Sequence, residues 1–152
     1  MFLTRAADYG IRVMIHLARL PAGERAALPT LAKAAEVPKS FLSKVLQSLT
    51  RAGLILSYRG NDGGFIILPA GQRATLRTVI EAIDGPLFLN LCLTSGRACS
   101  RSKQCPAHPL WIEAQQQVLA VLEHRDISQI ASTSETLPVA IKRAKPSAKT
   151  VI

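Results

Sequence analysis

Apolar residues recur at helical spacing in the first part of the chain. Ile11, Met14, Ile15 and Ala18 fall at i, i+3, i+4 and i+7, so they form one apolar stripe. Thr4 is a suitable N-cap for this helix, which is predicted to run to about position 20, where "PAGERA" interrupts the pattern. The chain therefore begins with an amphipathic helix that has one face for a core.

Two further helices follow, separated by the turn "VPKS". Apolar residues on one side predict a short second helix over about 28–36. Ser40 is a good N-cap for the third helix, which is predicted to run to about Arg51, and Gly53 stands where a C-terminal stop is usual. Five apolar residues form the predicted buried face of the third helix: Phe41, Leu42, Val45, Leu46 and Leu49.

A β-hairpin is predicted in "LILSYRGNDGGFIIL". Two apolar, β-rich runs flank "RGNDGG", a cluster that favours positive φ angles and therefore a turn. After the hairpin, Thr75 is expected to cap a helix through about Ile83, which "DGP" ends.

The remainder of the chain combines an irregular segment with a long helix. Residues 84–107 show no clear period. A long helix is predicted from about Pro106 to Arg125, and Asp126 is expected to cap one last short turn through Ile130. Six apolar residues are predicted to share one face of the long helix: Leu110, Trp111, Ala114, Val118, Val121 and Leu122.

The order helix, short helix, turn, helix and hairpin is that of a winged helix-turn-helix. The predicted fold is mainly α with a small β-hairpin wing. Three parts are expected: a DNA-binding domain over 1–75, a cluster loop and dimerisation helix over 76–131, and a disordered basic tail over 132–152. The long helix is too apolar for a lone surface helix, so we expect it to pack against its copy in a second chain.

The charge balance favours a polyanionic partner. Nineteen basic and ten acidic residues give a net charge of +9. The tail from Ser132 holds four bases and one acid, which leaves 15 bases and nine acids, or +6, in the first 131 residues. A basic domain indicates nucleic acid first, with a simple solubility charge as the alternative. No signal peptide and no membrane span are recognisable, so we expect a cytoplasmic protein with no membrane partner.

The predicted reading surface lacks acids. No carboxylate occurs from Val37 through Asn61, as suits a surface that contacts phosphates. Arg59 at the hairpin tip is expected to enter a minor groove, where negative potential is concentrated. The alternatives are an ordinary cationic face or a protein contact. The candidate DNA-binding residues are Lys39, Ser40, Ser43, Lys44, Gln47 and Arg51 on the third helix, and Arg59, Gly60 and Asn61 on the hairpin.

All three cysteines, Cys92, Cys99 and Cys105, lie within 14 residues, spaced C-x6-C-x5-C. Soft thiolates select iron–sulfur, zinc or copper(I). Zinc sites usually pair their ligands more tightly, so the wide gaps modestly favour an iron–sulfur cluster; three unligated thiols are the third alternative. A fourth ligand is expected from His108, three residues after Cys105, or from Asp8, although helix-start histidines are often exposed and acids between arginines are often ion-paired.

The chain resembles the Rrf-type iron–sulfur winged-helix regulators, the IscR/NsrR/RirA family. The resemblance runs from Met1 to about Ala131 and rests on "LT..ADYGIR", "FLSKVLQSLTRAGLI", "RGNDGGFIIL", the three-cysteine loop and "CPAHPLW". It implies a homodimer that binds a palindromic operator in double-stranded DNA and senses through a 2Fe-2S or 4Fe-4S cluster. It also implies DNA contacts at Ser40, Arg59 and Gly60, whereas Ser43 replaces an acid that IscR uses in base discrimination.

The resemblance also implies a set of cluster ligands. The family's three cysteines match Cys92, Cys99 and Cys105. The IscR pattern takes its fourth ligand at the position of His108, and the NsrR pattern takes it at the position of Asp8, supplied by the partner subunit. Because this chain has both residues, the resemblance leaves the fourth ligand open between them.

The functional prediction is a DNA-binding transcriptional repressor that senses nitric oxide, redox stress or iron–sulfur status, with cluster loss altering operator affinity. An enzyme is not predicted, because no nucleophile–base pair, phosphate loop or carboxylate dyad stands out. Two alternatives remain: a zinc-stabilised winged-helix DNA-binding protein without sensing, and an iron–sulfur redox protein.

Overall fold

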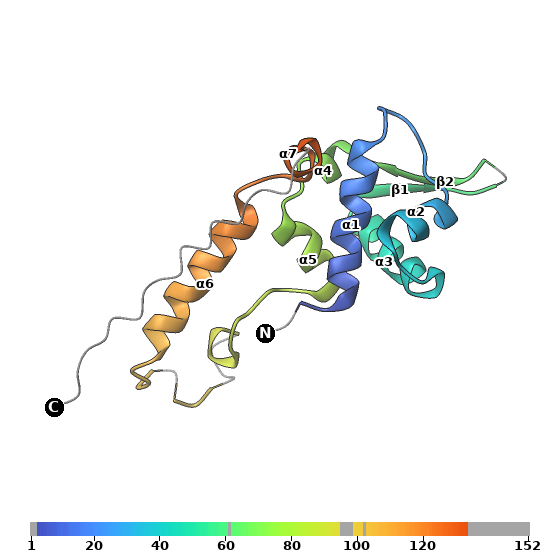
Figure 1. Cartoon of the computed structure of the whole chain (residues 1–152). Helices are drawn as coiled ribbons and strands as arrows, with labels where there is room; N and C mark the ends of the chain where they lie inside the picture. Colours follow the sequence, from blue (N-terminus) through green and yellow to red (C-terminus); the bar gives the residue numbers. More distant parts are fainter. Residues whose placement is uncertain (1–2, 61, 95–98, 102, 134–152) are drawn as a thin grey trace.

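A helix-turn-helix with a hairpin wing lies at one side of the molecule and a long helix extends from the other (Figure 1). The computed structural model describes residues 3–60, 62–94, 99–101 and 103–133. The elements in chain order are α1 (Arg5–Arg19), α2 (Leu28–Ala35), α3 (Lys39–Arg51), β1 (Ile55–Tyr58), β2 (Gly64–Ile67), α4 (Pro69–Gln72), α5 (Leu76–Asp84), the 3-10 turn η1 (Leu91–Leu93), α6 (His108–Glu123) and α7 (Ile127–Ser132). The mainly α fold with a two-stranded wing is confirmed.

Helix α1 begins where its sequence predicts and occupies the centre of the core. The Thr4 hydroxyl oxygen accepts from the Ala7 N–H at 3.2 Å and caps the helix. The same hydroxyl donates to the Asp84 carboxylate at 2.7 Å, which ties the start of α1 to the end of α5. Gly10 is buried on α1 directly against the tip of the Ile83 side chain, so a Cβ at this position would displace that side chain.

The start of α3 corrects two predictions. Pro38, not Ser40, is the N-cap, because the Pro38 carbonyl accepts from the N–H groups of Phe41 and Leu42 at 3.0 and 3.1 Å. Ser40 therefore lies within the first turn. Phe41 was predicted to be buried, but 61% of it is exposed, because the packed face of α3 is centred on Leu42, Val45, Leu46 and Leu49.

The wing is a short antiparallel ribbon with a third strand-like contact. Its register pairs Ile55 with Ile67 and Tyr58 with Gly64. On the other edge of β2, Ala26 and Phe65 exchange two backbone hydrogen bonds of 3.0 and 2.9 Å, so the loop between α1 and α2 pairs with the wing. Gly60 at the tip has a φ of 104°, which strongly favours glycine.

Helices α5 and α7 complete the core of the winged-helix region. Ile127 on α7 is fully buried in the cluster that contains Met14, Leu49 and Val79. Helix α4 was not predicted. The core therefore includes residues on both sides of position 75. The division of the chain into a DNA-binding domain, a cluster and dimerisation part and a tail stays a prediction. The tail expected to be disordered, 132–152, falls outside the described residues from position 134 onward.

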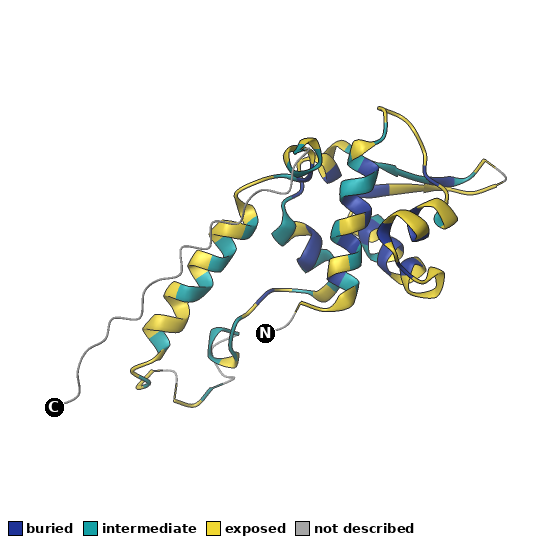
Figure 2. Ribbon diagram, viewed as in Figure 1, coloured by how far each residue is buried: buried dark blue, intermediate teal, exposed yellow. Residues whose placement is uncertain are grey.

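Helix α6 has no buried residue (Figure 2). One side, with Val118, Leu119 and Leu122, packs against a small cluster that includes Ile80. On other parts of its surface, Leu110 and Val121 are 67% and 73% exposed. The predicted single stripe is thus divided between a packed side and an exposed side, because α6 carries apolar residues around much of its circumference. Within the described ranges, no helix combines the length and apolarity that crossing a bilayer requires.

Replacing Asp126 with alanine is expected to lower Tm by about 4 °C, because the α7 cap is lost. The Asp126 carboxylate accepts from the Gln129 N–H and the Ser128 hydroxyl, each at 2.8 Å, and these bonds hold its pKa below the ordinary value. A lowered pKa stabilises the fold above pH 3.8, and this stabilisation is lost as the pH falls through the lower, folded-state pKa. Thermal melts between pH 2 and pH 7 measure both effects; an alanine variant with the wild-type pH profile would contradict the assignment.

Candidate nucleic-acid interface and cysteine loop

The solvent side of α3 carries the side chains that the sequence predicts for DNA contact. All six are exposed: Lys39, Ser40, Ser43, Lys44, Gln47 and Arg51. Two of them are held along the helix, since the Ser43 hydroxyl donates to the Lys39 carbonyl at 3.2 Å and Arg51 Nε donates to the Gln47 carbonyl at 3.4 Å. The exposed face is therefore cationic and rich in hydrogen-bonding groups.

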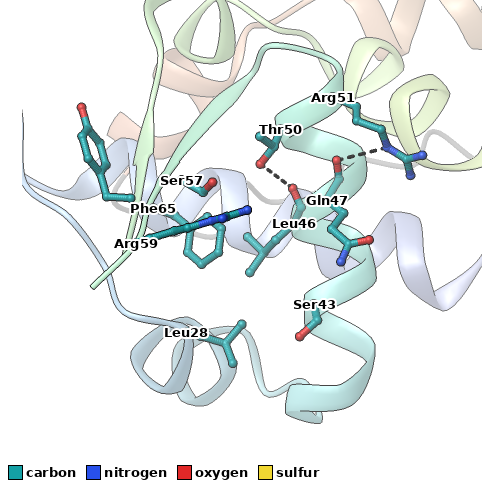
Figure 3. Close-up of a pocket in the computed structure, with 10 residues that line it drawn as sticks. Leu28, Ser43, Leu46, Gln47, Thr50, Arg51, Ser57, Arg59 and Phe65 are labelled. Carbon is teal, nitrogen blue, oxygen red and sulfur yellow. Dashed lines mark hydrogen bonds between the residues drawn. The ribbon is translucent and has the colours of Figure 1, made fainter. Parts of the chain in front are cut away.

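A groove of about 510 Å³ separates α3 from the wing (Figure 3). Its charged lining residues are Arg51 from α3 and Arg59 from the wing, and the described lining contains no carboxylate. In Figure 3 Arg59 points from the wing toward α3. The other lining residues are Leu28, Ser43, Leu46, Gln47, Thr50, Ser57, Tyr58 and Phe65. Gly60 is exposed at the tip, and Asn61 lies outside the described residues.

Sequence reasoning missed one cation at the wing. The Arg25 guanidinium carbon lies 3.8 Å from the ring centroid of Tyr58, and its Nη1 donates to the Asp62 carbonyl at 3.4 Å. Arg25 is in the segment "PAGERA", which reads only as a break between helices. Its contact with the wing depends on the long-range pairing of Ala26 with Phe65, for which the sequence gives no signal.

The three cysteines are all half-buried and lie between α5 and α6. Cys92 is in η1, whose cap is Asn90, and the Cys105 carbonyl accepts from the His108 N–H at 3.1 Å just before α6. Positions 95–98 and 102, between the thiols, are outside the described residues. In the part of the loop that is described, as in the other described ranges, no three His, Cys, Asp or Glu side chains are grouped so as to hold a metal ion.

The two candidate fourth ligands have different environments. Nδ1 of His108 is buried and has no hydrogen-bond partner among the described residues. Asp8, by contrast, makes a 2.8 Å ion pair with Arg12, and half of its side chain is exposed. A buried nitrogen without a partner requires an explanation, whereas an exposed i,i+4 ion pair on a helix is ordinary.

The segment before the cysteines is anchored to α6 by one side chain. The Gln115 amide donates to the Leu87 carbonyl at 2.6 Å and accepts from the Leu89 N–H at 2.9 Å. Glu81 on α5 also accepts from the Leu87 N–H at 3.3 Å. These bonds connect α5, α6 and the entrance to the cysteine loop.

Comparison with known proteins decides the family. The family model Rrf2, described as "Iron-dependent Transcriptional regulator", matches residues 3–133. The chain belongs to the Rrf2 family. It is therefore a winged-helix transcriptional regulator and not an enzyme, which confirms the resemblance and the functional class inferred from the sequence.

Solved structures with the same fold include other regulators. CymR (YrzC), the global cysteine regulator of B. subtilis, superposes with a TM-score of 0.72 at 24% identity over 89% of this chain and 99% of that one. Staphylococcus aureus CymR gives 0.69 at 26% identity over 88% and 100%. T. potens IscR gives 0.67 at 20% identity over 89% of each chain. Since the Rrf2 fold is shared by a cysteine regulator and by IscR, fold likeness does not decide the cofactor of this chain.

Proposed function

We propose that this Rrf2 regulator is a homodimeric repressor whose affinity for a palindromic operator depends on an iron–sulfur cluster in the cysteine loop. The observation that carries the DNA-binding part of the proposal is the cationic groove between α3 and the wing, where Arg51 and Arg59 face the same space without a carboxylate among the described lining residues. Lysine and arginine side chains neutralise phosphates, and a helix of the width of α3 fits a major groove.

The exposed apolar residues of α6 support a dimer. Leu110 and Val121 are more than two-thirds exposed, and Trp111 and Ile112 are 39% and 40% exposed. Large apolar side chains gathered on one helix are typical of an interface. A two-fold axis at α6 would present two copies of α3 to one duplex, and the expected operator is therefore an inverted repeat.

The donor chemistry of the cysteine loop supports a cluster. Three half-buried thiols suit iron and sulfide, and His108 Nδ1, a buried and unpartnered atom three residues after Cys105, can complete the set. Cys92, Cys99, Cys105 and His108 would hold the cluster, with Asp8 as the alternative to His108. When bound, the cluster supplies a centre that nitric oxide, oxidants and iron limitation damage. Gln115 keeps the entrance of the loop fixed to α6, so a change in the loop reaches the proposed dimer helix.

Operator binding by holo and apo protein tests this proposal. Purification without oxygen followed by selection from a randomised duplex library is expected to enrich an inverted repeat. Removal of the metal with a chelator is then expected to lower affinity for the selected duplex at least tenfold. Enrichment of an inverted repeat with equal holo and apo affinities would leave a regulator without a cluster switch, and a colourless protein that contains zinc would favour the zinc-stabilised alternative.

Substitution of Gln115 with leucine is expected to reduce the ratio of holo to apo affinity, because the loop entrance loses both bonds to α6. The free energy of unfolding should fall by about 1 kcal/mol, since the Leu87 carbonyl and the Leu89 N–H lose their partner. Urea denaturation and fluorescence anisotropy measure the two quantities. Gln116, the exposed neighbour on α6, is the matched control. An unchanged affinity ratio in Gln115→Leu would show that the coupling does not pass through this side chain.

A further inference from the structure

Arg25 is fixed to the wing at two points, although it belongs to the loop between α1 and α2. Its guanidinium stacks on the Tyr58 ring at 3.8 Å, and its Nη1 donates to the carbonyl of Asp62, beyond the tip. Stacking of a guanidinium on an aromatic face is a specific, attractive contact. The side chain is thus ordered on the wing before any ligand arrives.

The register of the ribbon places Arg25 on one particular face. Successive residues of a strand point to opposite faces, so the cross-strand pair Ser57–Phe65 lies on one face and Tyr58–Gly64 on the other. Arg25 covers the second face, since its Cβ is only 3.4 Å from the position that a Cβ on Gly64 would occupy. Arg59, in contrast, points toward α3 (Figure 3). The wing therefore carries one arginine for each of its two sides.

The charge of Arg25 is not neutralised by the contacts that hold it. Its partners are an aromatic ring and a backbone carbonyl, and among the described residues it makes no ion pair with a carboxylate. Arg25 and Tyr58 are both exposed. The result is an ordered, solvent-accessible cation with its charge available for an anion.

We propose that Arg25 contacts a DNA phosphate and that Tyr58 positions it there. This inference rests on the proposed docking of α3 and the wing on DNA. The minor groove is about 6 Å wide and has a phosphate backbone on each side, so a wing tip that enters it meets both strands. Arg59 would enter the groove and contact the DNA strand on the α3 side, and Arg25 would contact the strand on the opposite side. The interface then includes the loop between α1 and α2, which no helix-turn-helix pattern predicts.

The salt dependence of DNA binding tests this contact, because each phosphate contact adds about 0.9 to the slope of log K against log salt. The probe is the duplex selected by the wild-type protein, and its affinity is measured by anisotropy titrations between about 50 and 200 mM salt. Arg25→Gln is expected to reduce the slope by about 0.9 per subunit. It should weaken binding to the selected duplex and to a scrambled duplex by the same factor, because a phosphate contact carries no sequence information. Arg73→Gln is the matched control, since Arg73 is an exposed cation at the end of α4, at the base of the wing.

Two substitutions of Tyr58 separate positioning from general folding. Tyr58→Phe keeps the ring and should keep the wild-type slope, whereas Tyr58→Leu should lose part of it. Combined with Arg25→Gln, Tyr58→Leu should add nothing further, because both act on one contact. Circular dichroism checks that every variant is folded.

The outcomes distinguish this inference from the docking on which it rests. If Arg59→Gln lowers the slope and Arg25→Gln behaves like Arg73→Gln, docking stands and the Arg25 contact is wrong. If Arg25→Gln weakens binding without changing the slope, Arg25 only braces the wing, and the phosphate contact is again wrong. If folded wild-type protein selects no duplex, the docking fails and the inference fails with it.

Discussion

Exchange of Arg59 for glutamate is expected to lower affinity for the selected operator by about 100-fold, which corresponds to about 2.7 kcal/mol. The variant loses a cation that is expected to enter the minor groove, and it places a carboxylate in a groove where the charged lining residues are arginines. Repulsion between this carboxylate and the DNA phosphates adds to the lost contact. Fluorescence anisotropy with the operator duplex measures the loss.

Two controls make the Arg59 result specific. Arg59→Gln removes the charge without adding repulsion and should cost about tenfold, which corresponds to about 1.4 kcal/mol. Arg73→Glu makes the same charge change at an exposed position just after α4 and should cost less than twofold at physiological salt. If Arg59→Glu and Arg73→Glu weaken binding equally, net charge and not the wing determines affinity.

Replacement of His108 with alanine is expected to abolish a stable cluster, whereas replacement of Asp8 with alanine should leave it intact. His108 Nδ1 is buried, lacks a partner among the described residues and lies three residues after Cys105; Nε2 of His16 on α1 is also buried and unpartnered but has no cysteine near it in the sequence. The Asp8 carboxylate already pairs with Arg12 at the surface, and exposed pairs of this kind contribute little. Visible absorbance of anaerobically purified variants measures cluster content.

The visible absorbance of the two single variants distinguishes the two ligand assignments. Loss of absorbance in Asp8→Ala with retention in His108→Ala would assign the fourth position to the acid. Retention in both would mean that neither side chain is required. His124, which is exposed at the end of α6, is the matched control for loss of an imidazole, and His124→Ala should keep full absorbance.

Helix caps can be predicted from the sequence where a single side chain satisfies the first N–H groups of the helix. The caps at Thr4, Thr75 and Asp126 were all predicted, because each hydroxyl or carboxylate satisfies a nearby helix N–H. Ser40 has the same chemistry but was the wrong cap, since the Pro38 carbonyl accepts the first helical bonds. Helix α4 has only four residues and is too short to show a period.

Features that depend on distant contacts were not readable. Phe41 lies at the edge of the α3 stripe, and its exposure depends on how α3 packs against the rest of the core. The Arg25–Tyr58 stack needs the pairing of Ala26 with Phe65, which are 39 positions apart in the chain. The candidate cysteines and His108 were found from residue type and spacing, but the buried, unpartnered Nδ1 of His108 is a property of the folded loop.

Iron and labile sulfide in protein purified without oxygen test the central claim most directly. The account predicts a brown protein that contains both elements in equal amounts, and it predicts that Cys92→Ser removes both while the far-UV circular dichroism of the protein stays close to that of the wild type. Because Cys92 lies in η1, outside the main core cluster, its substitution should not unfold α1, α2 and α3. A pale wild-type protein without iron and sulfide would contradict the account.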